Sequence, residues 1–514
     1  HISYRLEGNA TRAASLSAPD YVLGNTASAQ WNLGAAAEYH HRTTEICLSY
    51  QHHENRSGIF YGTLAASAEE FIAQYEAGQP VTADLWSTTY DIDRAYQDVS
   101  HDRTILHVTT TPGAWLLETR YAFQRNHRQE YEQVRESIEG AQYNFTLRTH
   151  SLDATGTHPT YYVGDAATVE GGIGLQGIFQ ENIYRGYSLL PNYRGLGGGL
   201  FAFERLDLPN GAVTAGLRAD ALSRTAFLGE TDYDNHTDRE TLSGEDCTEL
   251  DSGTMRCPAA YRTGSVSLGG LWRPIPDTLE LKLDLSSASR FPNADELYLI
   301  GYAPSFPVYA LGAPDLGVET TWGASPTVGL RLGRLEAEVS GYANYTDDFI
   351  YFAPELTDAG EPRYEVTIRG AWPQYSYSPI DAFFTGTDGQ ITLGEEAPVG
   401  LRVQGAIVRA WDVASGDFLI GTPPDRGRVT LTGRPPEREW LVEPEVSVFV
   451  DAVARQSRTS PTADYVPAPD GYRLLGASGS VTLPLRDREM RVGLEGLNLL
   501  NTAYRDYTSL LRYY

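Results

Sequence analysis

Apolar and polar residues alternate along several segments of this chain, and this alternation restricts the fold more than any other feature of the sequence. Successive side chains of a β-strand point to opposite faces, so alternation predicts strands with one apolar and one polar face. The clearest case is the segment 279–286, where Leu279, Leu281, Leu283 and Leu285 alternate with Glu280, Lys282, Asp284 and Ser286. The segments 117–124 and 335–345 show the same pattern. In the segment 442–450, the pattern places Val442, Val446, Val448 and Val450 on one face and Glu443, Glu445 and Ser447 on the other.

The remainder of the sequence indicates an all-β protein. The chain holds 50 glycines and 28 prolines in recurring turn-like clusters, and no segment has the spacing of a long amphipathic helix. A membrane helix needs about 20 consecutive apolar residues, and no such run is present. The mean hydropathy of -0.34 is nevertheless compatible with a membrane barrel, because only every second residue of a barrel strand must face lipid.

Three features favour a transmembrane β-barrel over a β-sandwich, which can show the same alternation. The expected strands run to about ten residues, the length of a tilted membrane strand. Short turns, such as Gly333–Arg334 and Pro484–Asp487, alternate with long polar insertions such as 229–262. Aromatic residues gather where strands are expected to end, as in Tyr342, Tyr345, Phe349, Tyr351 and Phe352.

The charge of the chain excludes one class of partner. The formal net charge is -27, so no basic surface is available to neutralise phosphates, and we expect no nucleic-acid binding. Lys282 is the only lysine among 40 basic residues. Both a GC-rich genome and a salt-adapted host would explain this composition.

Cys247 and Cys257 lie in a polar stretch with nine residues between them. This spacing suits a disulfide that closes a loop in an oxidising compartment. A metal pair is the competing interpretation, but no histidine or further cysteine lies nearby.

The sequence supplies no catalytic constellation, so we expect no enzyme activity and no cofactor. No histidine, serine or cysteine has the spacing of an activated nucleophile. The pairs His40–His41 and His52–His53 are separated by about one strand length, which would place them at opposite rims, so we expect no metal site. The glycine-rich segment 195–201 starts no helical pattern and indicates a turn or a close approach of strands.

Two regions resemble TonB-dependent receptors. The C-terminal sequence VGLEGLNLLNTAYRDY is similar to the end of these receptors at Asn498, Leu499, Asn501, Tyr504 and Arg505. The stretch SRFPNADELY resembles a family motif at Arg290, Pro292, Asn293, Glu296, Leu297 and Tyr298, and it is followed at the family's interval by Asp315, Leu316 and Glu319. We expect Arg290 to pair with lumenal carboxylates of neighbouring strands and to stabilise the barrel.

The resemblance spans essentially the whole chain and implies an antiparallel transmembrane β-barrel, 22-stranded in the intact protein. Shorter matches, such as GIFYGT at 58–63 and GIGLQGIFQEN at 172–182, are similar to a branch of receptors that carries a carboxypeptidase-regulatory-like domain. Family members also have a plug domain and one more C-terminal strand, and nothing in residues 1–514 resembles either. We therefore expect residues 1–514 to form the barrel domain, with the plug and the terminal strands missing from this sequence.

The resemblance implies a transporter in the outer membrane of a diderm bacterium. Such receptors import bulky, scarce solutes, such as ferric siderophores and other metal chelates. The implied partners are outer-membrane lipid, a TonB-type energy-coupling protein acting through the plug, the solute and further outer-membrane or surface proteins. We expect binding by long loops near 229–262, 301–314 and 353–379.

Two alternatives remain open. The chain could be a barrel without a plug that serves as a passive pore or as a scaffold in a surface assembly. It could also be a secreted β-sandwich or lectin-like binder, in which case apolar faces such as that of Leu279–Leu285 would pack inward.

Overall fold

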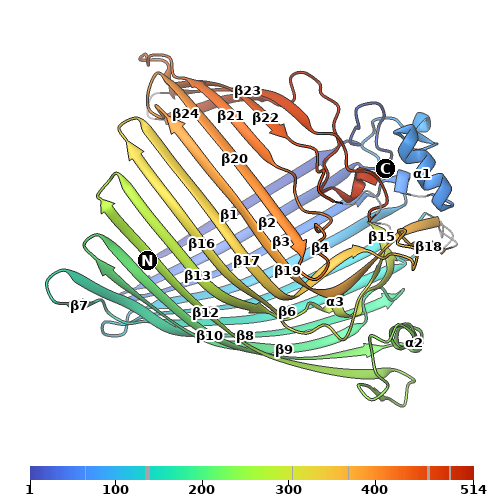
Figure 1. The fold of residues 1–514 in the computed structure, drawn as a ribbon. Helices are drawn as coiled ribbons and strands as arrows, with labels where there is room; N and C mark the ends of the chain where they lie inside the picture. The colour runs from blue at the N-terminus through green and yellow to red at the C-terminus, as the bar shows by residue number, and fades with distance from the viewer. Residues whose placement is uncertain are drawn as a thin grey trace.

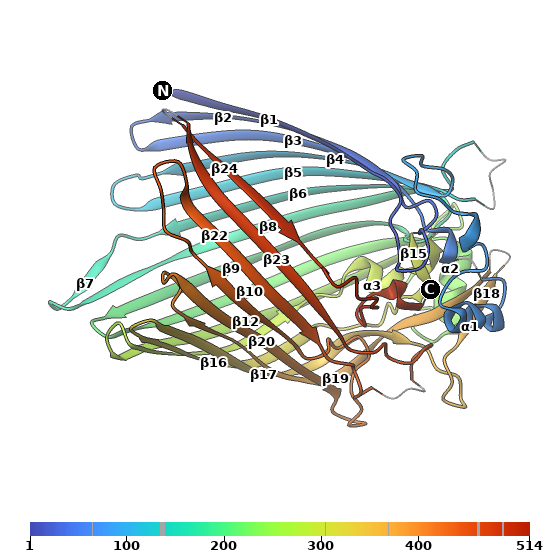
Figure 2. The same cartoon turned by 90° about the horizontal axis from the view of Figure 1, so that it is seen from above.

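The computed structural model of this chain describes residues 1–63, 65–133, 139–303, 305–367, 370–459, 463–485 and 488–513. Its 24 strands belong to one sheet. Nineteen of them form a curved wall, in which each strand pairs in antiparallel fashion with the next one along the chain (Figures 1 and 2). The all-β antiparallel fold predicted from the alternation is confirmed.

The wall strands range from 8 to 24 residues, so many of them extend well beyond the expected ten. Their bounds are β1 (Ile2–Ala13), β2 (Ser28–His41), β3 (Thr44–Gly58), β4 (Tyr96–Thr110), β5 (Leu116–Tyr131), β6 (Tyr143–Thr157), β8 (Ala167–Gly186), β9 (Asn192–Leu208), β10 (Gly211–Leu228), β12 (Met255–Ile275), β13 (Leu279–Arg290), β16 (Glu319–Leu332), β17 (Leu335–Pro354), β19 (Gly370–Leu393), β20 (Val399–Asp412), β21 (Arg426–Gly433), β22 (Val442–Val453), β23 (Tyr472–Leu485) and β24 (Arg488–Gly496).

The two rims of the wall differ. Most connections at one rim, such as that from β16 to β17, are tight turns, whereas the opposite rim carries long connections with their own elements (Figure 1). Part of the expected turn at 484–487, Arg486 and Asp487, lies outside the described residues. The smaller elements are η1 (Tyr61–Thr63), α1 (Ala68–Ala77), η2 (Ala83–Leu85), β7 (Tyr161–Val163), α2 (Glu230–Asp238), β11 (Thr248–Glu249), α3 (Ala294–Tyr298), β14 (Ile300–Ala303), β15 (Phe306–Leu311), β18 (Tyr364–Thr367) and η3 (Leu510–Tyr513).

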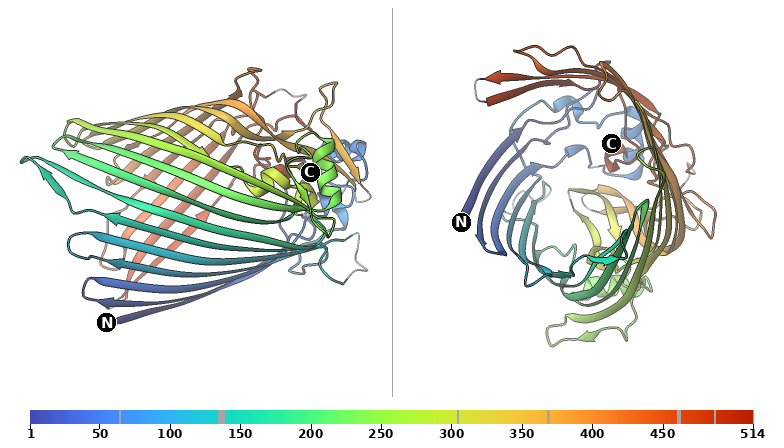
Figure 3. Two further views of the ribbon diagram at one scale, coloured as in Figure 1. Left: turned by 90° about the horizontal axis from the view of Figure 1, so that it is seen from below. Right: turned by 90° about the vertical axis from the view of Figure 1, so that its left-hand side faces the viewer.

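The wall curls around a central lumen without closing on itself in the described part of the chain. β1 pairs with β2 and β24 pairs with β23, and no pairing of described residues joins β1 to β24. The end-on view in Figure 3 shows these two strands at the two ends of the curved sheet.

The apolar faces of the strands point away from the lumen. Leu283 and Leu285 of β13 are 46% and 42% exposed, and Val339 of β17 is 47% exposed. A sandwich would bury these side chains between two sheets, so the β-sandwich alternative is wrong. No helix among the described residues is long and apolar enough to cross a membrane.

One predicted face assignment is wrong at the start of β22. Val442 pairs with Thr482, whereas Glu445 pairs with Ser480, so β22 holds one extra residue at this point. The extra residue forms a bulge next to Glu443, whose φ is 47°. Val442 therefore shares a face with Glu445 and lies opposite Val446, because a bulge changes the parity of the alternation.

The glycine-rich segment 195–201 lies inside β9, as the expected close approach of strands requires. A Cβ atom at Gly198 would lie 2.8 Å from the carbonyl oxygen of Gln176 on β8. At Gly199 it would lie 2.1 Å from Oδ1 of Asp220 on β10. Glycine at these positions lets β8, β9 and β10 pack closely.

An arginine placed on the outward face should destabilise the barrel. We expect Leu283→Arg to lower the free energy of unfolding from lipid vesicles by about 2–4 kcal/mol, because the charge would enter hydrocarbon. The matched control is Ser286→Arg, on the opposite face of β13 (Gly323 of β16 is its partner). Urea unfolding followed by gel mobility measures both variants, and equal stability of the two would contradict the face assignment.

Candidate functional site at the long-loop rim

The connection between β13 and β16, residues 290–319, folds into the mouth of the barrel and crosses it. On one side, Tyr309–Leu311 of β15 pair in parallel with Gln374–Ser376 of β19. On the other side, the hydroxyl of Tyr143 on β6 donates to the carbonyl oxygen of Tyr302 at 2.9 Å. Figure 3 shows this segment inside the curve of the wall. We call residues 290–319 the inner loop.

Arg290 holds both ends of the inner loop. Its guanidinium forms paired hydrogen bonds with Glu319 on β16, from Nε to Oε1 at 3.0 Å and from Nη2 to Oε2 at 2.9 Å. Nη1 lies 3.0 and 2.9 Å from the two carboxylate oxygens of Glu296 in α3. Glu319 also accepts from the backbone N–H of Ile350 on β17 at 3.0 Å. The planar arginine fork thus joins one loop helix to the wall.

The residues that follow Arg290 in the motif begin the helix α3. The Glu296 carboxylate accepts from the backbone N–H of Asn293 at 2.6 Å, which satisfies a free donor at the helix start. The carbonyl oxygen of Pro292 accepts from Arg224 of β10 at 2.7 Å. Tyr298 is 3% exposed and packs in the main cluster of buried apolar side chains at this rim. These motif residues therefore fix the position of the inner loop.

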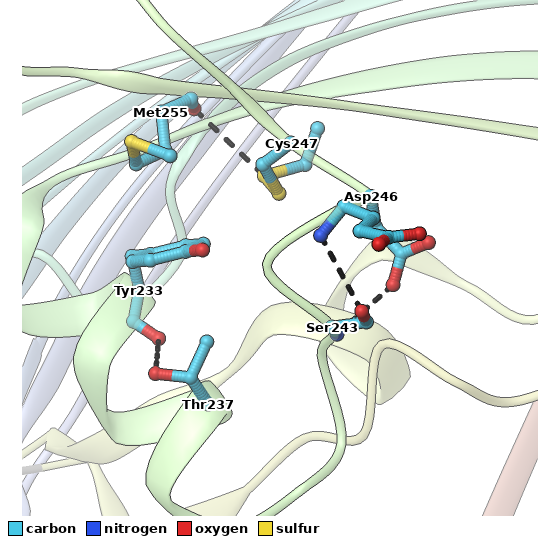
Figure 4. Close-up of a disulfide and its surroundings, with 8 residues drawn as sticks. Tyr233, Thr237, Ser243, Asp246, Cys247 and Met255 are labelled. Carbon is cyan, nitrogen blue, oxygen red and sulfur yellow. Dashed lines mark hydrogen bonds between the residues drawn. A yellow bond between two sulfur atoms is a disulfide. The ribbon is translucent and has the colours of Figure 1, made fainter.

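The connection between β10 and β12 carries α2 and a disulfide. Cys247 and Cys257 are joined, with an S–S distance of 1.99 Å and a Cα–Cα distance of 4.3 Å. Cys257 belongs to β12, so the disulfide holds the loop against the wall (Figure 4). Within the loop, the backbone N–H of Ser243 donates to the Asp246 carboxylate at 2.9 Å.

His236 of α2 is completely buried between this loop and the inner loop. Its ring lies 6.4 Å from that of Tyr298 in an edge-on arrangement. Nε2 has no hydrogen-bond partner among the described residues, and Nδ1 lies 3.5 Å from the Thr241 hydroxyl. Burial, with a smaller contribution from the positive charge of Arg239, lowers the pKa of His236 to about 4. The imidazole is therefore neutral at pH 7.

The C-terminal motif residues form a compact turn beyond β24. The Asn498 side chain accepts from the backbone N–H of Thr502 at 2.8 Å and donates to its carbonyl oxygen at 3.0 Å. The ring of Tyr504 lies 4.3 Å from that of Tyr472 on β23. The Arg505 guanidinium lies 5.1 Å from the ring centre of Tyr75 in α1.

A second buried network at this rim was missed by the sequence analysis. Nη2 of Arg512 lies 2.5 Å from the carboxylate of Asp464, and the two side chains are 4% and 5% exposed. The Tyr513 hydroxyl donates to the same carboxylate at 2.8 Å and lies 2.5 Å from the Tyr375 hydroxyl. These residues come from three distant segments, so only the fold brings them together.

The comparisons with known proteins decide the family. A family model described as "TonB dependent receptor-like, beta-barrel" matches residues 5–499. The chain belongs to this family. TonB-dependent receptors are transporters and not enzymes, and they are known as outer-membrane proteins. No curated protein sequence matches the chain significantly.

Solved structures of this receptor family share the fold at low sequence identity. The copper transporter OprC has a TM-score of 0.69 at 14% identity, and the alignment covers 99% of this chain and 71% of that one. The hemophore receptor HasR of Serratia marcescens, solved with its hemophore and heme, has a TM-score of 0.64 at 16% identity, covering 98% and 74%. The FrpB iron transporter of Neisseria meningitidis has a TM-score of 0.64 at 11% identity, covering 98% and 74%.

The three loops expected to bind solute lie at the same rim of the receptor. Parts of them are strands of the wall: Met255–Arg262 belong to β12 and Gly370–Pro379 to β19. The inner loop contains the expected segment 301–314. Ala353 and Pro354 end β17, and the other described residues of 229–262 and 353–379 form connections at the same rim.

The prediction that the two histidine pairs lie at opposite rims is wrong for the second pair, because His52 and His53 lie near the middle of β3. His40 and His41 end β2 at the short-turn rim, whereas His52 and His53 lie in the half of β3 nearer the long loops. His40 lies between two carboxylates, with Nε2 3.0 Å from Glu38 and Nδ1 3.6 Å from Glu45. One ligand atom from each of Glu38, His40 and Glu45 could reach a common metal ion. Among the described residues, these three form the single group of side chains with this arrangement.

The burial of neutral His236 predicts a pH-dependent loop. Because its folded-state pKa is lowered, its contribution to stability is complete above pH 6.5 and is lost as the pH falls towards 4. We expect the opening free energy of residues 230–241 to fall by about 3 kcal/mol between pH 7 and pH 4. Hydrogen exchange, corrected for intrinsic rates, measures this change. His236→Asn should remove most of the pH dependence, and equal dependence in both proteins would contradict the assignment.

Proposed function

We propose that this receptor is an active transporter in the outer membrane of a diderm bacterium and imports a bulky, scarce solute, such as a ferric siderophore or another metal chelate. The observation that carries the proposal is the family's barrel with long loops folded over its mouth. A solute from outside would meet these loops before the lumen.

Three similar structures support the choice of solute class. They are a copper transporter, a hemophore receptor solved with heme, and an iron transporter. They share the fold with this chain at 16% identity or less, so they suggest metal-containing solutes as a class and leave the particular chelate open.

In this proposal, residues 1–514 are the barrel domain, and a TonB-type protein acts through a plug domain in its lumen. The solute binds to the loop segments around the inner loop, and further outer-membrane or surface proteins could assemble on them. The motif residues Arg290, Pro292, Asn293, Glu296 and Tyr298 position the inner loop, and Asn498, Tyr504 and Arg505 hold the C-terminal turn. The Cys247–Cys257 disulfide restrains the loop between β10 and β12.

The alternative of a passive pore fits this arrangement less well. The inner loop contacts β6 on one side and β19 on the other, so it obstructs the mouth. A loop fixed across the mouth narrows the path for free diffusion.

Solute uptake tests the proposal. A host strain with the gene deleted should accumulate radiolabelled ferric chelates poorly from dilute solution, and the gene in its natural full length should restore uptake. Dissipating the proton-motive force should abolish uptake, since the energy comes through TonB. The control is a sugar small enough to diffuse through general porins. Deletion of the gene should not change the uptake of this sugar. Restored uptake that persists without the proton-motive force would instead identify a passive pore.

A further inference from the structure

A row of charged side chains crosses six neighbouring strands on the outer face of the wall. Cross-strand pairing aligns one residue from each of the strands β3, β4, β5, β6, β8 and β9, which lie side by side in Figure 2. In order, these residues are His52, Asp102, Arg125, Arg148, Glu181 and Arg194. We call them the outer charged row.

The contacts of β5 show that this row faces away from the lumen. Arg128 donates to the hydroxyl of Ser305 in the inner loop at 2.6 Å, so its side chain points into the barrel. Arg125 lies three residues away on a regularly paired strand and therefore points outward. Arg148 is its direct partner on β6 and shares its face. Their side chains are 41% and 47% exposed.

From Asp102 to Arg194, positive and negative side chains alternate along the row except at the Arg125–Arg148 pair. Directly opposed residues have Cβ atoms about 4.5–5.5 Å apart, and like charges at that distance destabilise a sheet. The pair stands out in a chain of net charge -27. An anion between the two guanidinium groups would remove the repulsion.

The nearby carboxylates occupy few of the hydrogen-bond donors of these two arginines. Asp102 lies 2.8 Å from both His52 Nδ1 and the Tyr50 hydroxyl, but 3.5 Å from Arg125. Glu181 lies 2.8 Å from Arg194 but 3.5 Å from Arg148. Each guanidinium group has five N–H donors. Within the described residues, the 3.5 Å contact is the single hydrogen bond that each of the two guanidinium groups makes. Most of their donors thus remain open to a ligand.

The residues below the pair place it at the edge of the apolar band. One step towards the short-turn rim, the rings of Phe123 and His150 lie 4.9 Å apart on the same outward face. The next step holds Tyr121 and Leu152, each 40% exposed. Aromatic side chains of membrane barrels gather where hydrocarbon meets the polar headgroups. Arg125 and Arg148 therefore lie at headgroup level, on the side of the long loops.

We propose that Arg125 and Arg148 form a binding site for the phosphate of a membrane lipid, at the headgroup level of the leaflet on the long-loop side. Paired guanidinium groups match phosphate oxygens in geometry and charge, and the apolar face below accommodates the acyl chains. A free anion would gain the charge contacts alone. The site rests on the barrel's position in a membrane and is independent of the solute that the receptor carries.

Lipid titration of the full-length protein in uncharged detergent micelles tests the site. The probes are phosphatidic acid and a diacylglycerol with the same acyl chains, with binding measured by native mass spectrometry. We expect phosphatidic acid to bind tightly and the diacylglycerol weakly. The affinity of the Arg125→Gln/Arg148→Gln variant for phosphatidic acid should be lower by about tenfold or more. Lysine at both positions should give an intermediate affinity, since an ammonium group cannot bind bidentately.

The matched control is Arg331→Gln/Arg402→Gln, which removes the same charge near the short turns, where these arginines pair with Glu336 and Glu395. It should bind phosphatidic acid as the unmodified protein does. Unchanged gel mobility of the folded form shows that each variant retains its barrel.

Equal lipid binding by the unmodified protein and the Arg125/Arg148 glutamine variant would overturn the proposal, as would equal binding of the diacylglycerol. Full displacement of the lipid by an equal concentration of inorganic phosphate would also overturn it, and would indicate a free-anion site. Lost binding with intact solute uptake in a host strain would support the lipid site and leave the transport proposal standing.

Discussion

The pairing of backbone groups between neighbouring strands is the constraint on which the rest of this receptor depends. In lipid, every unpaired N–H or C=O group costs several kcal/mol, so a wall of strands must satisfy its hydrogen bonds from strand to strand. The antiparallel register achieves this between the neighbouring strands of the wall, while the outer edges of β1 and β24 have no partner strand among the described residues. The same register fixes which side chains face outward. The long strands also carry the wall past the apolar band, which gives the loops a rigid base.

The loops at the long-loop rim use that base to build a folded layer inside the mouth. Arg290 joins the wall to α3 through Glu319 and Glu296. The disulfide restrains the neighbouring loop, and the Asp464–Arg512 pair adds a second anchor. Ion pairs such as these contribute little net stability, but the loss of one partner is costly where the pair is buried, as Asp464–Arg512 is. Their effect here is to give the inner loop one position across the lumen.

The sequence was sufficient to predict the wall, because alternation depends on residues that are neighbours along one strand. The alternation predicted that Leu283 and Leu285 share one face, and the structure shows that this face points outward. Val442 was assigned to the wrong face because a bulge depends on the partner strand, and a single extra residue leaves no mark in the alternation. For the glycines of segment 195–201 the sequence left a turn or a close approach of strands open, and the pairing of β9 with β8 and β10 shows the close approach.

The candidate site was only partly predictable. The motif around Arg290 pointed to lumenal carboxylates, but nothing in the sequence indicated that the inner loop crosses to β19. The Asp464–Arg512–Tyr375 network was not predicted because its members are up to 137 residues apart. The Arg125–Arg148 pair also required the register between β5 and β6. Contacts between distant segments depend on the complete fold, which local patterns do not encode.

A disulfide lock on the inner loop tests the central claim that this loop controls access to the lumen. Leu311 of the inner loop is the cross-strand partner of Ser376 on β19, and paired residues of neighbouring strands lie within the Cα–Cα range that a disulfide spans. Cysteines at these two positions should therefore form a bond that fixes the loop across the mouth. The measurement is uptake of ferric chelate by cells that carry this double variant in the full-length receptor, before and after mild reduction. We expect little uptake while the lock is closed and recovery on reduction, with each single variant active throughout. Full uptake with the lock shown to be closed would contradict it.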